Sequence, residues 1–215
     1  MSDGQQLISW RSSNVYENDL MLLENNQWLN DRILTFVAEY VAEIGEKKDP
    51  NLIHIFGPTE TEMIKTVDEG TLTAMFGELG LRNKNFVAFI VNDNLDPTKP
   101  NGGSHWSLLV FYRLYNMFIH LDSMKAHKNW VLAKDIASKM SRLVGQEGNE
   151  VKNMDVPRQQ NCYDCGVFVA EFLNIIVMTE DPKNIFEANP DEISASRQNW
   201  ASIIKNWSDN GISED

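Results

Sequence analysis

The chain has 215 residues, of which 42% are hydrophobic, and a formal net charge of −12 at pH 7. This length can bury a sizeable core, and we predict a single domain over residues 1–215. The acidic balance argues against nucleic acid as a partner, because phosphate contacts need a basic face, and it favours a basic protein surface instead. No apolar run reaches the roughly 18 residues that span a bilayer, so we expect no membrane association.

The first residues, Met1 to Gln6, contain no basic segment followed by an apolar one, as a secretory signal peptide would. The chain has two cysteines, which fits a reducing compartment in which disulfides are rare. We therefore expect a monomeric protein in the cytoplasm, small enough to enter the nucleus.

The order of the predicted elements is α+β, without repeats, low-complexity segments or a clear linker. Apolar residues at 3.6-residue spacing predict helices, and runs rich in β-branched and aromatic residues predict strands. In chain order we expect a helix at about 30–44, helices at 59–66 and 71–79, strands at 86–92, 105–112 and 117–122, a helix at 129–144, a strand at 151–156, and helices at 165–178 and 191–207. The longest irregular piece, Asn92 to Ser104, ends at a histidine and is expected to face a substrate.

A thiol stands where the apolar helix at 165–178 begins. This helix is apolar nearly all round, as a buried central helix should be. A helix N-terminus favours an anion, and the thiolate is the nucleophilic form of cysteine. Cys165 is therefore the candidate nucleophile.

A histidine and a carboxylate stand at the ends of the two strands on either side of residues 113–116, which we expect to form a hairpin. In an antiparallel hairpin, facing residues lie at equal distances along the sequence from the centre of the turn. A turn centred near 113–114 therefore makes His105 face Asp122. Facing residues lie roughly 4.5 to 5.5 Å apart at Cβ, so Asp122 can orient the imidazole and stabilise the imidazolium. Together with Cys165 these residues make a Cys/His/Asp hydrolase.

Four segments resemble the Ulp/sentrin-specific cysteine protease family in order and spacing along nearly the whole chain. They are Trp28-Leu29-Asn30-Asp31, His105-Trp106-Ser107-Leu108, Leu121-Asp122-Ser123, and Gln159-Gln160-Asn161 followed by Asp164-Cys165-Gly166. Within the family the chain is most similar to the deneddylating branch, which processes and removes the ubiquitin-like modifier Nedd. Three features indicate this branch: the absence of a long N-terminal extension, Val91-Asn92-Asp93-Asn94, and the segment from Gly102 to Val110.

The resemblance implies a papain-like Ulp-type fold, with a central mixed or antiparallel sheet flanked by helices and the nucleophile at the N-terminus of a buried helix. It implies that Cys165 attacks the carbonyl after the modifier's terminal Gly-Gly, and that His105 acts first as base and then as acid. Gln159 matches the family's oxyanion-hole glutamine, with both amide hydrogens free to point inward beside the Cys165 backbone N–H. No cofactor or metal is expected, because the histidines show no close metal-ligand pairing and two cysteines cannot complete a tetrahedral site.

Two tryptophans carry the expected specificity for a glycine tail. Residues at the positions of Trp28 and Trp106 line a narrow channel in the family, where any Cβ on the substrate would collide. Asp31 is either an acid favoured by the helix dipole or, by the resemblance, a partner for a basic residue of the modifier's tail.

Several other functions stay open at this point. The protease could be directed at SUMO or ubiquitin, the protein could be a non-catalytic module that binds such modifiers, or it could be an acyltransferase with the same triad. Cys162 and Cys165 also form a C-x-x-C pair, which would suit a thiol-disulfide oxidoreductase but stands too late in the chain for that motif. A related hypothesis is reversible inactivation by a Cys162–Cys165 disulfide, which would need an accessible Cys165.

Overall fold

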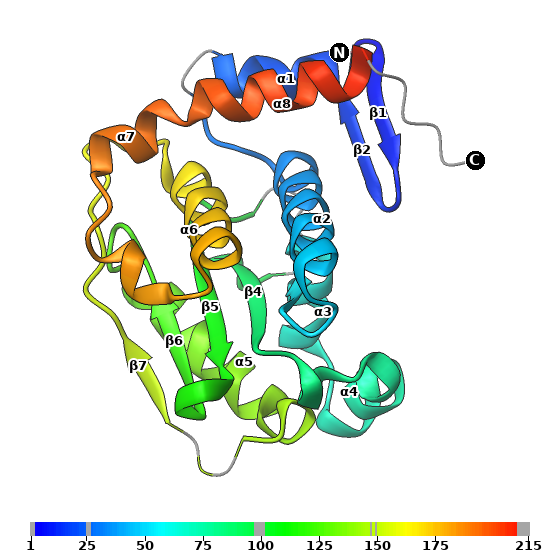
Figure 1. Cartoon of the computed structure of the whole chain (residues 1–215), viewed down its shortest axis with the longest axis vertical. Coiled ribbons are helices and arrows are strands. Elements are labelled where there is room, and N and C mark those ends of the chain that lie inside the picture. The colour runs from blue at the N-terminus through cyan, green and yellow to red at the C-terminus, as the bar shows by residue number, and fades with distance from the viewer. Residues whose placement is uncertain (1–2, 25–26, 97–101, 147, 149, 210–215) are drawn as a thin grey trace.

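A mixed five-stranded sheet runs through the centre of the computed structural model (Figure 1). The structure describes residues 3–24, 27–96, 102–146, 148 and 150–209. In spatial order the strands are β3 (Ile53–Phe56), β4 (Phe86–Asn92), β5 (Trp106–Tyr112), β6 (Met117–Leu121) and β7 (Val151–Asn153). The two outer pairs of neighbours are parallel and the two inner pairs are antiparallel. This is the predicted α+β class with a central mixed sheet.

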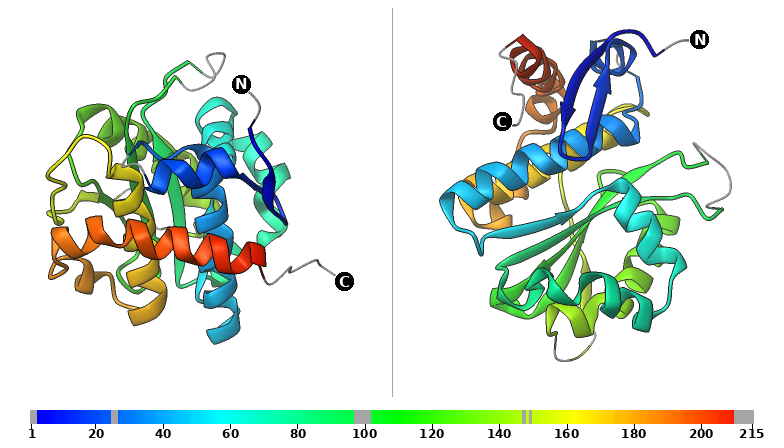
Figure 2. Two further views of the ribbon diagram at one scale, coloured as in Figure 1. Left: turned by 90° about the horizontal axis from the view of Figure 1, so that it is seen from above. Right: turned by 90° about the vertical axis from the view of Figure 1, so that its right-hand side faces the viewer.

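Helices cover both faces of the sheet, as the two views of Figure 2 show. The helices α2 (Asp31–Lys48) and α6 (Cys165–Thr179) lie side by side on one face (Figure 1). The opposite face carries α3 (Pro58–Thr66), α4 (Glu69–Phe76) and α5 (His127–Val144). None of the helices in the described part of the chain is long and apolar enough to cross a membrane.

The central strands are apolar on both sides because each face is covered by helices. In β4, Phe86, Ala88 and Ile90 belong to the core beneath α2 and α6, whereas the alternating residues Val87 and Phe89 belong to the core beneath α3 to α5. Strand side chains alternate between faces, so a strand buried on both sides appears as an unbroken apolar run. This is why β4 and β5 are found where the sequence predicts them.

A peripheral layer of N- and C-terminal elements packs across the ends of α2 and α6. It consists of the hairpin β1 (Gln6–Trp10) and β2 (Ser13–Tyr16), then α1 (Glu17–Glu24), α7 (Pro190–Ala195) and α8 (Arg197–Asp209). The helices α1 and α8 lie side by side (Figure 1). Aromatic rings join the layer to α2: the ring centroid of Trp207 lies 4.7 Å from that of Trp10 and 5.8 Å from that of Phe36.

The predicted elements all occur, with shifted ends. The first predicted helix runs to Lys48, the helix predicted at 71–79 becomes α4 and a 3₁₀ turn, η1 (Gly77–Leu79), and the last predicted helix is divided at Ser196 into α7 and α8. The other 3₁₀ turns are η2 (Leu81–Asn83), η3 (Arg113–Tyr115) and η4 (Pro182–Ile185). Sequence reasoning missed β1, β2, α1 and β3. Residues 97–101 of the predicted substrate-facing loop lie outside the described residues.

The predicted register of the β5–β6 hairpin is wrong by two positions. The connection is η3 followed by Asn116 in a left-handed conformation, so Tyr112 faces Met117 and the last pair is Leu108 with Leu121. His105 and Asp122 therefore lie beyond the paired residues instead of facing each other. A shift of two positions keeps both side chains on the same face of the sheet, and diagonal neighbours remain within reach of long side chains.

A buried ion pair ties the last helix to the residue that precedes α6. Arg197, the first residue of α8, contacts the Asp164 carboxylate through Nε at 3.0 Å and Nη2 at 2.8 Å, and both side chains are 3% exposed. The same guanidinium donates to the carbonyl oxygens of Leu22 in α1, at 2.7 Å, and Tyr163, at 3.2 Å. Asp164 in turn accepts a bond from the Asn161 side chain at 2.7 Å. The segment that leads into α6 is thus fixed from the far end of the chain.

Replacing Arg197 by alanine should strongly destabilise the protein, because it leaves the Asp164 carboxylate buried without a partner. Breaking a buried pair in this way costs about 3–5 kcal/mol. Urea unfolding followed by circular dichroism measures the loss. The matched control is Lys205→Ala, which removes the other α8 ion pair, with Glu24; that pair is solvent-exposed and is worth less than about 1 kcal/mol. Equal losses in the two variants would contradict the prediction.

Candidate active site

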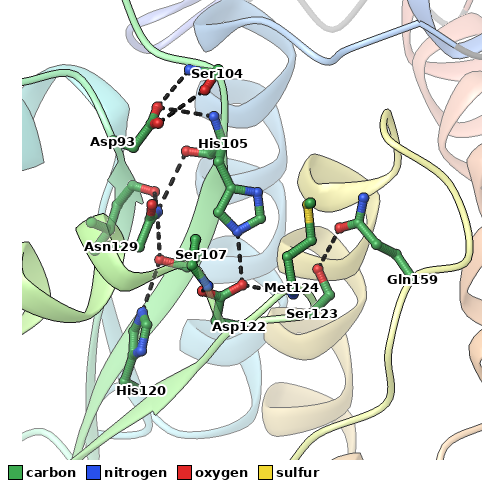
Figure 3. A network of polar contacts seen from close by, with 12 residues as sticks. Asp93, Ser104, His105, Ser107, His120, Asp122, Ser123, Met124, Asn129 and Gln159 are labelled. Atoms are coloured by element: carbon green, nitrogen blue, oxygen red, sulfur yellow. Dashed lines mark hydrogen bonds and ion pairs between the residues drawn. The ribbon is translucent and has the colours of Figure 1, made fainter.

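The ends of two central strands bring a histidine and an aspartate together. His105 immediately precedes β5 and Asp122 immediately follows β6, and the distance from His105 Nε2 to Asp122 Oδ1 is 2.7 Å (Figure 3). The side chains are 6% and 0% exposed. The structure thus brings these two predicted residues into direct contact, although by a diagonal arrangement and not by the predicted cross-strand pairing.

The turn after β6 encloses the Asp122 carboxylate. Oδ1 accepts a bond from the Met124 N–H at 2.8 Å, and Oδ2 accepts one from the Ala126 N–H at 2.7 Å. Burial acts to raise the pKa of Asp122, but the bond and charge of His105 and the bond from Met124 outweigh it, so the pKa lies below its ordinary value. Asp122 is therefore held as an anion in a fixed orientation.

Burial alone would lower the pKa of His105, yet its surroundings raise the pKa to about 9. The bond and charge of Asp122 contribute most to this increase, followed by the neighbouring Cys165 sulfur. Because Nε2 is directed at Asp122, Nδ1 is the nitrogen left for the thiol. Nδ1 is buried and has no hydrogen-bond partner within the described residues, so the contact with the sulfur is a close approach and not a formed hydrogen bond.

Cys165 is the first residue of α6 and only 2% of it is exposed to solvent. The expectation that its thiol is accessible to bulk solvent is therefore wrong. The helix start packs tightly on the segment before α2: a Cβ added at Gly166 would lie 2.9 Å from the Leu29 Cβ. Trp106 donates its indole N–H to the Leu29 carbonyl oxygen at 2.9 Å, which fixes this segment from β5. Cys165 nevertheless lines a cavity.

This cavity, of about 370 Å³, contains the predicted channel residues together with the thiol. Its lining includes Trp28, Asp31, Trp106 and Cys165, and also the ends of the segment between β4 and β5, at Asn92, Asn94, Gly102, Gly103 and Ser104. The Trp28 ring is half-exposed, whereas Trp106 is buried. The cavity is therefore lined by one half-exposed indole, one buried indole and the residue that carries the thiol.

A second carboxylate lines this cavity, and sequence reasoning missed it. Glu62 of α3 joins Asp31 there, and burial raises the pKa of both carboxyl groups. Lys65 pairs with Glu62 at 2.5 Å and also donates to the carbonyl oxygens of Asn92, at 3.0 Å, and Asn94, at 2.9 Å. Only the helical spacing of residues 59–66 predicted this element, and spacing alone does not show which face meets the cavity.

Gln159 lies beside the turn that follows β6 (Figure 3) and is not among the residues that line the cavity. Its Oε1 accepts a bond from the Ser123 hydroxyl at 2.6 Å, and its Nε2 donates to the Asn161 carbonyl oxygen at 2.7 Å. The expectation that both amide hydrogens point inward is therefore wrong, because one is used by Asn161.

The two cysteines differ in their surroundings. Both are free thiols, and Cys162 is exposed whereas Cys165 is buried. The carbonyl oxygen of Cys162 accepts a bond from the Trp28 indole N–H at 2.6 Å. The disulfide between them stays a prediction.

The family is decided by comparison with known proteins. A model of the Ulp1 protease family, C-terminal catalytic domain, matches residues 27–210. The chain belongs to this family. It is accordingly a cysteine peptidase that is specific for ubiquitin-like modifiers.

Relatives cover nearly the whole of this Ulp1-family protein. A protein of Dictyostelium discoideum named probable sentrin-specific protease 8 is 34% identical over 85% of this chain and 81% of its own. Human sentrin-specific protease 8 is 33% identical, over 92% and 95% respectively. NEDD8-specific protease 1 of Arabidopsis thaliana is 29% identical, over 99% and 98%.

Solved structures share the fold at lower sequence identity. The yeast Ulp1 protease domain, solved in complex with Smt3, the yeast ortholog of SUMO, has a TM-score of 0.74 and 19% identity, covering 96% of this chain and 89% of its own. A Xanthomonas campestris effector bound to ubiquitin has a TM-score of 0.58 and 21% identity, covering 82% and 91%. The Ulp-type fold expected from the resemblance is thus confirmed.

The raised pKa of His105 predicts the alkaline side of the activity profile. Below this pKa His105 is an imidazolium, which can protonate the leaving amine, and this form is lost as the pH rises through the pKa, so kcat/KM should fall above a pH of about 9. Asp122→Asn removes the charge that raises the pKa of His105 and should move the fall to lower pH. Rates on a fluorogenic modifier amide across pH 6 to about 10.5 measure both profiles. A rate that keeps increasing through this range would contradict the prediction.

Proposed function

We propose that the protein cleaves after the C-terminal Gly-Gly of the modifier NEDD8, both in maturing its precursor and in releasing it from target lysines. The observation that carries the proposal is the buried His105–Asp122 bond beside Cys165, which lines the same cavity as Trp28 and Trp106. NEDD8 is the proposed modifier because a relative that matches nearly the whole chain is named for that specificity. We further infer a monomeric protein in the cytoplasm, with access to the nucleus by size and with no nucleic acid or membrane as partner.

In the proposed reaction the Cys165 sulfur attacks the carbonyl carbon of the terminal glycine. The proton that leaves the thiol is held on His105 Nδ1, where the raised pKa of the ring retains it, and is then given to the leaving amine, while Asp122 holds the ring through Nε2. Water then hydrolyses the thioester with His105 as base. These roles follow from which nitrogen of the ring is bonded to the carboxylate.

The oxyanion of each tetrahedral intermediate needs N–H donors that are not already bonded to another acceptor in the protein. The first hydrogen bond of α6 is donated by the Phe168 N–H to the Asp164 carbonyl oxygen, so the Cys165 N–H is among the unpaired donors of the helix start. We infer that it acts with the remaining amide hydrogen of Gln159, which the bonds to Ser123 and Asn161 hold in place. Loss of one such donor typically reduces kcat by about a hundredfold or more.

Of the two carboxylates that line the cavity, Glu62 already pairs with Lys65, so Asp31 is the one expected to attract an arriving cation. Burial disfavours the ionised forms of Asp31 and Glu62, and an arriving positive charge would offset that cost. We therefore propose that Asp31, with Glu62 beside it, pairs with a basic residue of the modifier's tail just before Gly-Gly.

Modifier preference is tested with NEDD8, SUMO and ubiquitin that carry a C-terminal thiol-reactive group. NEDD8 should attach most rapidly, and peptide mapping should place the adduct on Cys165. Faster labelling by SUMO or ubiquitin would replace the proposed modifier but keep the chemistry. An adduct on Cys162 would contradict the assignment of the nucleophile.

The nucleophile and the orienting carboxylate should respond differently to substitution. Cys165→Ala should abolish cleavage and leave binding of the modifier nearly intact, because the thiol contributes little contact area. Asp122→Asn should lower kcat by up to about 10⁴-fold, because the correct tautomer of the histidine is lost, as happens with the equivalent substitution in a serine protease. Retained turnover in the first variant, or a loss below about tenfold in the second, would show that the residue has another role.

The channel should discriminate by size at the last residue of the tail. Trp28 and Trp106 both line the cavity, and we expect their indoles to exclude a Cβ, so a NEDD8 fusion ending in Gly-Ala should be cleaved far more slowly than one ending in Gly-Gly. An alanine substitution in the tail outside the channel provides the control. Equal rates for Gly-Ala and Gly-Gly would exclude the channel as the source of specificity.

A further inference from the structure

The last rung of the β4–β5 ladder is built partly from a side chain. Asn92 faces Trp106 in the register, which places Asp93 opposite His105. The Asp93 N–H donates to the His105 carbonyl oxygen at 3.1 Å, as in an ordinary antiparallel pair. The return bond, however, goes from the His105 N–H to Asp93 Oδ1, at 3.0 Å. A carboxylate therefore takes the place of a main-chain acceptor at the residue that carries the imidazole.

The same carboxylate also holds the preceding residue. The Ser104 N–H donates to Asp93 Oδ1 at 2.5 Å, and the Ser104 hydroxyl donates to Oδ2 at 2.9 Å (Figure 3). Asp93 is 8% exposed, and although burial acts to raise its pKa, the bonds from Ser104 and His105 lower it. The anion thus fixes two consecutive backbone N–H groups and one side chain.

Contacts on the other sides leave the backbone at His105 little freedom. Asn129 of α5 is fully buried and donates to the Ser107 hydroxyl at 2.9 Å and to the His105 carbonyl oxygen at 3.4 Å. A Cβ added at Gly103 would lie 1.6 Å from the Asn92 Oδ1, so the Asn92 side chain would have to move to admit any other residue there. Asp93 is the member of this arrangement that bonds the His105 N–H directly.

We propose that Asp93 is a positioning residue, which sets the location of the His105 ring between Asp122 and Cys165 by clamping the backbone of Ser104 and His105. The inference rests on the proposed role of His105 in the reaction. The ring is bonded to Asp122 at one nitrogen and must present the other to the sulfur, so a shift of the backbone affects both contacts. A misplacement of about 1 Å can cost about a hundredfold in rate. The Val91-Asn92-Asp93-Asn94 motif thereby gains a physical role.

Three substitutions of Asp93 separate geometry from charge. Asp93→Asn keeps an acceptor for both N–H groups and removes the charge, whereas Asp93→Glu keeps the charge and moves the carboxylate by one methylene. Asp93→Ala removes every bond. If the role is positional, kcat on a NEDD8 fusion should stay within about threefold for asparagine and fall by about ten- to a hundredfold for glutamate and alanine, with KM nearly unchanged. The reverse order, with asparagine impaired and glutamate active, would overturn the proposal.

Asp68 provides a matched control away from the active site. Its carboxylate also accepts two backbone N–H bonds and one hydroxyl bond, from Gly70 and Thr71, at the start of α4. Asp68→Ala should reduce stability in urea unfolding while leaving kcat and the pH profile unchanged. If Asp93→Ala likewise changes only stability, Asp93 is a structural residue and the proposal fails.

The free enzyme offers a readout that needs no turnover. Titration of the His105 ring by NMR should give a high pKa in the wild type, because the bond to Asp122 is intact, and a lower pKa in Asp93→Glu and Asp93→Ala, because the ring is displaced from that bond. An unchanged titration in these variants would overturn the proposal even if the modifier assignment is wrong. A wild type that titrates as expected but does not cleave NEDD8 would contradict only the proposed function.

Discussion

The buried hydrogen bond between His105 and Asp122 imposes the central constraint on this structure, because both residues lie just beyond the paired parts of their strands. An ion pair with almost no solvent contact is favourable only when its remaining polar atoms are also bonded. The turn after β6 supplies two N–H donors to Asp122, and Asp93 fixes the backbone of His105. The ends of the central strands are therefore organised around this one contact.

The helices and strands that form the layers of the fold can be predicted from local patterns in the sequence. The register of the strands and the contacts between distant segments cannot. The strands β4 and β5 are predicted because residues buried on both faces form unbroken apolar runs. The hairpin register is missed because it depends on the left-handed Asn116 and a 3₁₀ turn, neither of which has a distinct composition. The first hairpin is missed because Trp10 is buried by Trp207, at the other end of the chain, and this cannot be read from a short window.

The reacting groups leave local signals, but the residues that hold them do not. Cys165 opens an apolar helix, and His105 and Asp122 adjoin apolar strands, so each stands out next to its own element. Asn129 and Arg197 are polar residues whose partners lie far away in sequence, and in the sequence they resemble ordinary helix-surface residues. Asp93 belongs to a segment that the resemblance singled out, but its bonds to Ser104 and His105 could not be predicted from that segment. The orientation of the Gln159 amide likewise depends on the Ser123 hydroxyl, which arrives from another segment.

The ion pair between Arg197 and Asp164 has a consequence for the order in which the fold is completed during synthesis. Domains form as the chain leaves the ribosome, beginning from the N-terminal side. A nascent chain can already contain His105, Asp122 and Cys165, yet Asp164 has no counter-ion until the start of α8 emerges. The loop before the nucleophile is therefore completed only after the start of α8 has been synthesised, although it lies next to the reacting groups in the fold.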